Sequence, residues 1–146
     1  MDELIIKPTD KSLAVDISYG ILSFTGRSIL TDPKIFFEPV NNWVVKYLRN
    51  PADETVINIK LEYIDTASTQ ALYQILRQLN TVRKKGLVVM LNWYIEDEDP
   101  EMKELGEMIE QRLGIEFQYI TYSPKLISCF CFVLVSRKNP KFGNYI

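Results

Sequence analysis

The sequence predicts an α/β fold in which helices pack against a mixed β-sheet. From Asp32 onward, segments with the two-residue alternation of a strand follow segments with the apolar spacing of a helix. This order is typical of parallel strands joined by right-handed helical crossovers. Before Asp32, two alternating segments flank Tyr19 and Gly20, which predicts an antiparallel hairpin. We therefore expect a mixed sheet that begins with a β-hairpin and carries about three helices.

Composition places the chain among ordinary globular proteins. Its 146 residues fit one domain, and 47% of them are hydrophobic while 25% are charged. The net charge of −2 and the lack of a basic block argue against a nucleic-acid-binding protein. The first residues lack the basic and apolar regions of a signal peptide, so we expect a cytoplasmic protein without a membrane partner.

The chain contains no histidine, which removes the commonest general base and the commonest metal ligand. Its two cysteines, Cys129 and Cys131, fall on one face of a predicted strand and do not form a zinc site by themselves. The acidic run from Asp97 to Glu101 is read as a solvated helix start, because it lacks the spacing of a calcium loop. We expect no metal and no cofactor.

The N-terminal part is expected to contain three short strands, of which the last two form the hairpin. The strands are predicted over Glu3–Lys7, Ser12–Ser18 and Ile21–Thr25, and Gly26–Ser28 is expected to end the hairpin.

A helix is expected to start at Asp32 and Pro33, which have the pattern of an N-cap followed by a first-turn proline. Pro39 falls inside the helical pattern and predicts a kink in the first turn or a delayed start, because proline lacks the N–H that a helix needs. The apolar spacing ends before Pro51.

The central region predicts strand Thr55–Ile64, helix Ala67–Lys85 and strand Leu87–Ile95, with the two strands adjacent in one sheet. The second strand is an almost continuous apolar run, as in strands buried on both faces. The first has a polar face, so we expect helices to cover one side of the sheet more fully. A helix starting in the acidic run and a strand over Ile115–Thr121 follow.

The join between the central strand and helix is rich in side-chain oxygen. Four of the five residues from Asp65 to Thr69 carry one, at the point where a helix leaves its first N–H groups unpaired. One interpretation is that Asp65 or Thr66 caps the helix. The other is that Thr66 is phosphorylated, since the field at a helix N-terminus favours an anion.

Several motifs in order resemble one known family, the SiaC family of regulatory phosphoproteins, over roughly residues 4–119. The motifs are Gly20–Ser28, Phe36–Val40 with Trp43 and Tyr47, Tyr63–Ser68, Asn92–Tyr94, and Met102 with Gly106 and Glu107. The resemblance implies a STAS-like fold, similar to that of bacterial anti-sigma factor antagonists.

The resemblance also implies a function. In the family, a dedicated Ser/Thr protein kinase and a phosphatase act on a threonine at the strand-to-helix turn, which here is Thr66 by motif match. The phosphorylation state selects the partner, and the unphosphorylated form can activate a diguanylate cyclase. The chain departs from the usual Asn-Thr-Ser-Ser motif at Asp65 and Ala67, while alternative acceptors remain at Ser68 and Thr69. The expected partner-binding residues around Thr66 are Asp65, Ser68, Thr69, Gln70 and Tyr73.

Three other functions are considered. The chain could be a binding protein like the anti-sigma factor antagonists, or a structural or oligomerisation domain. A small hydrolase with Thr66 or Ser68 as nucleophile is the weakest alternative, because only Asp65 offers a nearby base.

The tail differs in composition, so we divide the chain into a domain of residues 1–122 and a C-terminal extension of residues 123–146. Leu126–Val135 is the most apolar window in the sequence and is too short to span a bilayer. We expect it to be an additional strand that returns antiparallel beside Ile115–Thr121.

Overall fold

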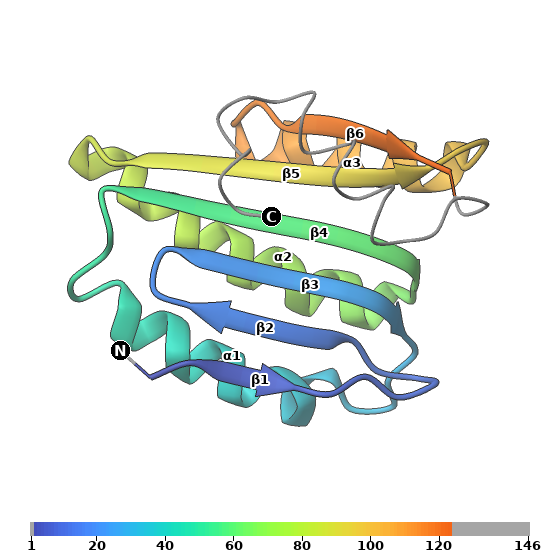
Figure 1. Ribbon diagram of the computed structural model, residues 1–146, viewed down its shortest axis with the longest axis horizontal. Coiled ribbons are helices and arrows are strands. Elements are labelled where there is room, and N and C mark those ends of the chain that lie inside the picture. The colour runs from blue at the N-terminus through green and yellow to red at the C-terminus, as the bar shows by residue number, and fades with distance from the viewer. Residues whose placement is uncertain (1, 124–146) are drawn as a thin grey trace.

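The computed structural model describes residues 2–123, which form one six-stranded mixed sheet (Figure 1). The strands lie in the sheet in the order in which they occur in the chain, from β1 to β6. The first three pair antiparallel and the last four pair parallel. Their bounds are β1 Leu4–Ile6, β2 Ala14–Ser18, β3 Ile21–Ser28, β4 Glu54–Ile64, β5 Val88–Glu96 and β6 Gln118–Tyr122. The predicted fold class is confirmed.

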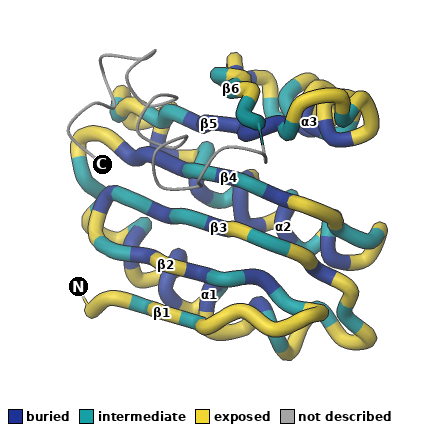
Figure 2. Tube along the Cα trace, turned by 45° about the vertical axis from the view of Figure 1, so that its right-hand side comes forward, coloured by how far each residue is buried: buried dark blue, intermediate teal, exposed yellow. Residues whose placement is uncertain are grey.

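All three α-helices in the described part of the chain pack against the same face of the sheet (Figures 1 and 2). Helices α1 (Pro33–Tyr47), α2 (Thr66–Asn80) and α3 (Pro100–Leu113) each connect one parallel strand to the next. Because each connection steps the same way across the sheet with the same hand, all three helices fall on one side. The other face, called the helix-free face below, carries no helix from residues 2–123.

The core lies between this helical layer and the inner face of the sheet. Phe24, Ile59 and Trp93 from three different strands are fully buried there, together with Phe37 of α1 and Leu72 of α2. β4 and β5 are neighbours over seven residue pairs, from Glu54 opposite Val88 to Lys60 opposite Tyr94. The predicted adjacency of these two strands is confirmed.

Strand β3 continues to Ser28, beyond its predicted end at Thr25, but its antiparallel pairing with β2 ends at Thr25, so Gly26–Ser28 lies beyond the hairpin as predicted. Gly26 pairs with Leu61 of β4 and the next residue pairs with Tyr63, so the register shifts by one residue at this point. Gly26 has a φ of +107°, which glycine adopts without a steric penalty. The irregularity lets the strand resume and reach Ser28.

Helix α1 begins at Pro33, as predicted, and runs through Pro39 to Tyr47 without a break. The delayed start considered from the sequence is therefore wrong. Pro39 and Ile35, whose carbonyl loses its helical N–H partner, both lie on the exposed side of the helix. Water can bond this carbonyl there, which lowers the cost of the proline.

The helix predicted to end at Lys85 is two elements, α2 and a 3₁₀ helix, η1 (Thr81–Lys85). The Thr81 hydroxyl donates to the carbonyl oxygen of Gln78 at 2.6 Å, in competition with the regular backbone pattern. Gly86 then ends η1 with a φ of +83°.

Strand β5, which was predicted to be buried on both faces, is buried in this way over only part of its length. Residues Leu91–Ile95 are buried, whereas Val88 at its start is 50% exposed. The Trp93 indole N–H donates to the Met102 carbonyl oxygen at 3.0 Å, which ties β5 to helix α3. A Cβ at Gly106 would lie 2.7 Å from the indole nitrogen, so a glycine is required for this close approach.

Strand β6 was predicted to begin at Ile115, but it begins at Gln118. The amide of Phe117 donates to Glu110 Oε2 of α3 at 2.6 Å instead of joining the ladder. Ile115 and Phe117 are nevertheless buried, so their apolar pattern reflects burial before the strand starts. The strand expected over Leu126–Val135 lies outside the described residues.

Candidate functional site

The site that the sequence singled out is the junction of β4 and α2. β4 ends at Ile64 and α2 begins at Thr66, with Asp65 in extended conformation as the N-cap between them. Asp65 Oδ1 accepts a hydrogen bond from the Ser68 amide at 2.8 Å, and the Thr69 hydroxyl donates to the Asp65 carbonyl oxygen at 2.8 Å. Of the two predicted caps, Asp65 is the one that forms.

Asp65 also connects α2 to the segment between β3 and α1. Its backbone amide donates to the Ser28 carbonyl oxygen at 2.9 Å, and its Oδ2 accepts from the Leu30 amide at 3.0 Å. One side chain therefore fixes both the start of α2 and the chain that leads to α1. The extension of β3 to Ser28 makes this possible, because it brings that segment beside the end of β4.

These contacts keep the Asp65 carboxyl ionised. Burial by itself would raise its pKa, but hydrogen bonding by Ser68 and by the Leu30 amide outweighs burial, and the pKa lies below its ordinary value of 3.8. The Ser68 amide is the donor at this residue, because the buried Ser68 hydroxyl oxygen has no hydrogen-bond partner.

The hydroxyl-bearing residues of the junction separate into an outer and an inner group. Thr66 is exposed at the first position of α2, whereas Ser68 is fully buried and its hydroxyl oxygen has no hydrogen-bond partner. Thr69 is half-buried and its hydroxyl is engaged by Asp65. Of these three residues, Thr66 is the one that is exposed in the folded chain.

The other predicted partner-binding residues extend along α2. Gln70 is exposed and Tyr73 is half-buried against the core. They follow Thr66 by four and seven residues, which places all three on one side of a helix. The structure therefore brings these residues together on one strip and excludes Ser68 from it.

A groove beside this strip separates α1 from α2. Its volume is about 690 Å³, and Phe37, which lines it, is fully buried. The α2 residues that line it lie three or four positions apart on one side of the helix, and the first of them directly follows Thr66. The lining residues are Pro33, Lys34, Phe37, Glu38 and Asn41 of α1 and Ala67, Gln70, Ala71 and Gln74 of α2.

Of these residues, only Gln70 is predicted from the sequence to contact a partner. The spacing of Ala67, Ala71 and Gln74 does place them on one face of α2. The α1 residues that line the groove could not be predicted in the same way. The contact between α1 and α2 depends on the order of β3, β4 and β5 in the sheet, which spacing within one helix does not give. Two small residues, Ala67 and Ala71, were the only signal in the sequence that α2 is approached closely here.

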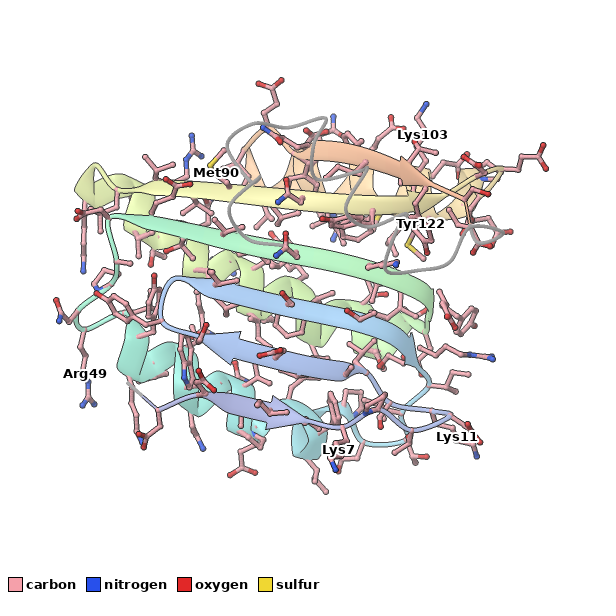
Figure 3. All side chains as sticks on the ribbon, viewed as in Figure 1. Lys7, Lys11, Arg49, Met90, Lys103 and Tyr122 are labelled. Carbon is pink, nitrogen blue, oxygen red and sulfur yellow. The ribbon has the colours of Figure 1, made fainter. Side chains whose placement is uncertain are left out.

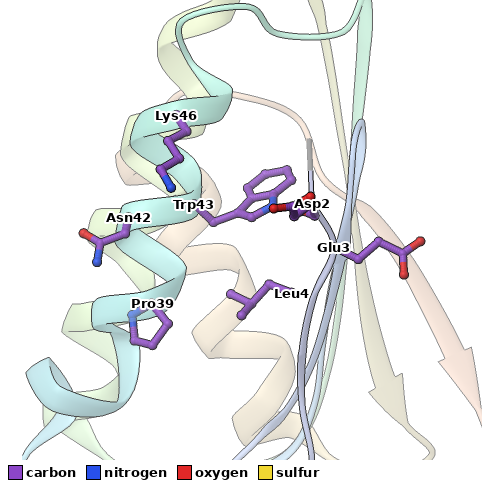
Figure 4. A pocket seen from close by; sticks show the side chains of 7 residues that line it. All are labelled: Asp2, Glu3, Leu4, Pro39, Asn42, Trp43 and Lys46. Carbon is purple, nitrogen blue, oxygen red and sulfur yellow. The ribbon is translucent and has the colours of Figure 1, made fainter.

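A second hollow lies between the N-terminal segment and α1 (Figure 4). Its volume is about 430 Å³, and the Trp43 indole N–H in its wall donates to the Asp2 carbonyl oxygen at 2.8 Å. Asp2, Glu3, Leu4, Pro39, Asn42, Trp43 and Lys46 line it. This hydrogen bond ties the segment that precedes β1 to α1.

Neither metal ligands nor a membrane-spanning helix mark the described part of the chain. Within residues 2–123, no three side chains of His, Cys, Asp or Glu are grouped so that they could hold a metal ion. In the same range, no helix has the length and apolar character needed to cross a bilayer.

Comparison with known proteins gives one consistent result. The model of the family described as "SiaC family regulatory phosphoprotein" matches residues 6–122. An uncharacterized protein of Pseudomonas aeruginosa is 27% identical over 119 residues, which cover 80% of this chain and 94% of that protein.

Two solved structures from the same bacterium are similar in fold. The crystal structure of apo-SiaC has a TM-score of 0.72 and 26% identity, covering 82% of this chain and 98% of the other. SiaC in complex with the diguanylate cyclase SiaD has a TM-score of 0.75 and 24% identity, covering 82% and 99%. In that complex SiaC is described as the activator of SiaD.

Proposed function

Because the chain belongs to the SiaC family of regulatory phosphoproteins, we propose that it is a partner-switching regulator controlled by phosphorylation of Thr66. The exposure of Thr66 at the start of α2, where Asp65 rather than Thr66 supplies the cap, is the observation that carries the proposal. A phosphoryl group on Thr66 would therefore not disrupt the cap. A cognate Ser/Thr kinase would add it and a phosphatase would remove it.

The groove between α1 and α2 is the surface proposed for the effector. It begins at Ala67, next to Thr66, and its exposed polar rim includes Gln70 and Gln74 around the buried Phe37. A helix from a partner can bind such a groove with an apolar side chain over Phe37. By analogy with the relative that activates a diguanylate cyclase, we propose an enzyme of that class as the effector.

The switch would act through charge at the edge of this interface. A phosphoryl group adds about −1.5 to −2 charges and lies beside the Asp65 carboxylate, which its hydrogen bonds keep ionised. A partner that accepts the neutral hydroxyl of Thr66 would then have to pack against two adjacent anions. Like charges in an interface cost several kcal/mol, which is enough to release a partner of micromolar affinity.

We propose that the chain has no catalytic activity of its own and acts in the cytoplasm with its kinase and phosphatase. The hydrolase alternative is weakened further by the site. Ser68 is buried, and Thr66 makes no hydrogen bond to a side-chain base among residues 2–123. If the chain is instead a binding protein like the anti-sigma factor antagonists, its effector would be a different protein, but the proposed phosphorylation site would be the same.

The test is the intact mass of the protein isolated from its source cells, before and after treatment with a broad-specificity Ser/Thr phosphatase. We expect a species heavier by one phosphate that the treatment removes, with the phosphate mapped to Thr66. Thr66→Ala should abolish it and the matched Ser68→Ala variant should retain it. Phosphate on the Thr66→Ala protein, or its absence from the native protein and after incubation with the cognate kinase, would overturn the assignment.

A further inference from the structure

The two helices that form the groove start at the same end of the sheet (Figure 1). α1 follows β3 and α2 follows β4, and these strands are parallel neighbours, so both helices begin at the carboxyl ends of their strands. The Asp65 carboxylate contacts the segment before α1 through the Leu30 amide and the first turn of α2 through the Ser68 amide. Lys34, the second residue of α1, therefore lies level with Thr66, the first residue of α2.

Lys34 is an exposed cation at the Thr66 end of the groove, which it lines together with Ala67 and Gln70 of α2. Ala67 directly follows Thr66 and Gln70 lies one turn beyond it, so Lys34 faces the part of α2 that carries Thr66. Within residues 2–123, the Lys34 side chain makes no hydrogen bond and no ion pair, not even with Glu38 one turn later on α1. Its charge is therefore available to a group on Thr66.

The distance between the two helices allows Lys34 to reach a phosphate on Thr66. The axes of packed helices lie about 8–10 Å apart. The five bonds from the Lys34 Cα to its ammonium nitrogen span about 6 Å when extended, and the bonds from the Thr66 Cα to a phosphate oxygen span about 4 Å. The two side chains can therefore meet across the mouth of the groove once Thr66 carries a phosphate.

The groove already has one polar bridge between the helices, at the end remote from Thr66. The side-chain nitrogen of Gln78 on α2 donates to Asn41 Oδ1 on α1 at 3.2 Å. In the part of the chain that the structure describes, no other side-chain hydrogen bond joins these two helices. The Thr66 end of the groove therefore has no such bridge in the unmodified chain.

We propose that phosphorylated Thr66 forms an ion pair with Lys34, so that the phosphate bridges α1 and α2 at the mouth of the groove. The inference rests on the proposed function, because it assigns a counter-ion to the phosphate that the proposed kinase adds. Lysine binds phosphate as a compact positive charge with three N–H donors. One ammonium group does not cancel the phosphate and the Asp65 carboxylate together, so the edge of the groove stays anionic.

This ion pair gives phosphorylation a second way to release a partner. In the unmodified chain the Lys34 side chain is free to contact an acidic group of the partner. In the phosphorylated chain it is held toward α2, across the opening that leads to the buried Phe37. An apolar side chain of the partner would then reach Phe37 only by displacing the ion pair.

Two other basic residues lie at this end of the sheet, and neither lines the groove. Arg27 lines a different hollow of about 370 Å³, together with Glu62 on the helix-free face. Lys11 lies in the loop between β1 and β2, where its carbonyl oxygen accepts a hydrogen bond from the Ile29 amide at 2.8 Å (Figure 3). Arg49 lies at the opposite end of the molecule in the same view. These three residues provide controls that remove the same charge from other places.

The test measures the ionisation of the phosphate by ³¹P NMR in the full chain. Phosphothreonine is incorporated at position 66 during translation, so the measurement needs no kinase. The second pKa of such a phosphate is about 6, and a nearby ammonium group lowers it by favouring the dianion. Lys34→Gln should therefore raise the phosphate pKa by about 0.3–0.7 pH unit, the range for an exposed ion pair. Lys34→Arg keeps the positive charge and should keep the low pKa.

The control variants Arg27→Gln, Lys11→Gln and Arg49→Gln should each change the phosphate pKa by less than Lys34→Gln does, because salt screens distant charges. In the urea-unfolded chain the effect of Lys34→Gln should vanish, since the pair requires the fold. An equal pKa with and without Lys34, a larger rise in a control variant, or a rise that persists in urea would overturn the pairing. Absence of phosphate from Thr66 in cells would instead overturn the proposed function, which the intact mass tests separately.

Discussion

The Asp65 carboxylate accepts a hydrogen bond from the Leu30 amide, 35 residues earlier in the chain, at an N–O distance of 3.0 Å. The other oxygen of the same carboxylate accepts from the Ser68 amide at 2.8 Å. The first contact fixes the segment that leads into α1, and the second fixes the start of α2. The two helices that form the groove are thereby positioned by one side chain at the groove's Thr66 end.

Replacing Asp65 with alanine should destabilise the protein by about 2–4 kcal/mol. The loss combines an N-cap, worth about 1 kcal/mol, with an unpaired Leu30 amide, worth about 1–3 kcal/mol. Asp32→Ala is the matched control, because Asp32 holds the N-cap position of α1 without a side-chain capping bond. Urea unfolding should show a change within about 0.5 kcal/mol for the control. Equal losses for both variants would contradict the role assigned to Asp65.

The contribution of Asp65 to stability should disappear in acid. Its pKa is lower in the folded chain than its ordinary value of 3.8, so the unfolded chain binds the proton more tightly. The stabilisation is therefore complete well above pH 3.8 and is lost as the pH falls through the folded pKa. Unfolding free energies of the native protein and Asp65→Asn, measured from pH 6 downward, should converge below pH 3.8. A constant difference across this range would mean that the carboxylate charge is not involved.

The outline of the fold could be predicted from the sequence because it depends on local patterns. The alternation in β4 and the apolar spacing in α2 predicted β4 and the start of α2 to within one residue, and Asp65 was one of the two caps predicted from position alone. The link from Asp65 to Leu30 could not be predicted. It depends on β3 lying beside β4 and on the irregularity at Gly26 that carries β3 to Ser28.

The same limit applies to the groove and to Gly106. Helical spacing placed Ala67 and Ala71 on one face of α2, but nothing local indicated which helix would oppose them. Gly106 interrupts a helical pattern without an evident local reason, since the need for it comes from the Trp93 ring of another element. Residues whose role depends on a contact between distant segments are thus the ones that sequence patterns missed.

Gly106→Ala should destabilise the protein although alanine favours helices. The new Cβ would lie 2.7 Å from the Trp93 indole nitrogen, so either α3 or the ring must move. Such overpacking typically costs about 1–3 kcal/mol, and movement would weaken the bond from the indole to the Met102 carbonyl oxygen. Near-ultraviolet circular dichroism and urea unfolding measure both effects. Glu107→Ala, at the adjacent exposed position, should leave both unchanged.

If the effector occupies the groove, a charge placed far from Thr66 should also weaken binding. Gln74 is an exposed lining residue eight positions beyond Thr66, which is about 12 Å along the helix. Gln74→Arg should reduce affinity for the proposed effector at least tenfold in a calorimetric titration while the unfolding free energy stays the same. The exposed Glu104→Arg on α3 is the control. Unchanged affinity for Gln74→Arg would confine the contact to the start of α2.

Thr66→Asp should weaken binding of the effector without destabilising the fold. Thr66 is the first residue of α2, where an added carboxylate interacts favourably with the helix dipole by about 0.3–1 kcal/mol. The variant should therefore unfold at the same or a slightly higher urea concentration than the native protein. Its affinity for the effector should fall at least tenfold, because the new charge lies beside ionised Asp65 at the rim of the groove. Thr66→Asn is the matched control, because it has nearly the same size as aspartate and no charge. If Thr66→Asn loses as much affinity as Thr66→Asp, the hydroxyl itself is the contact and charge is not the switch.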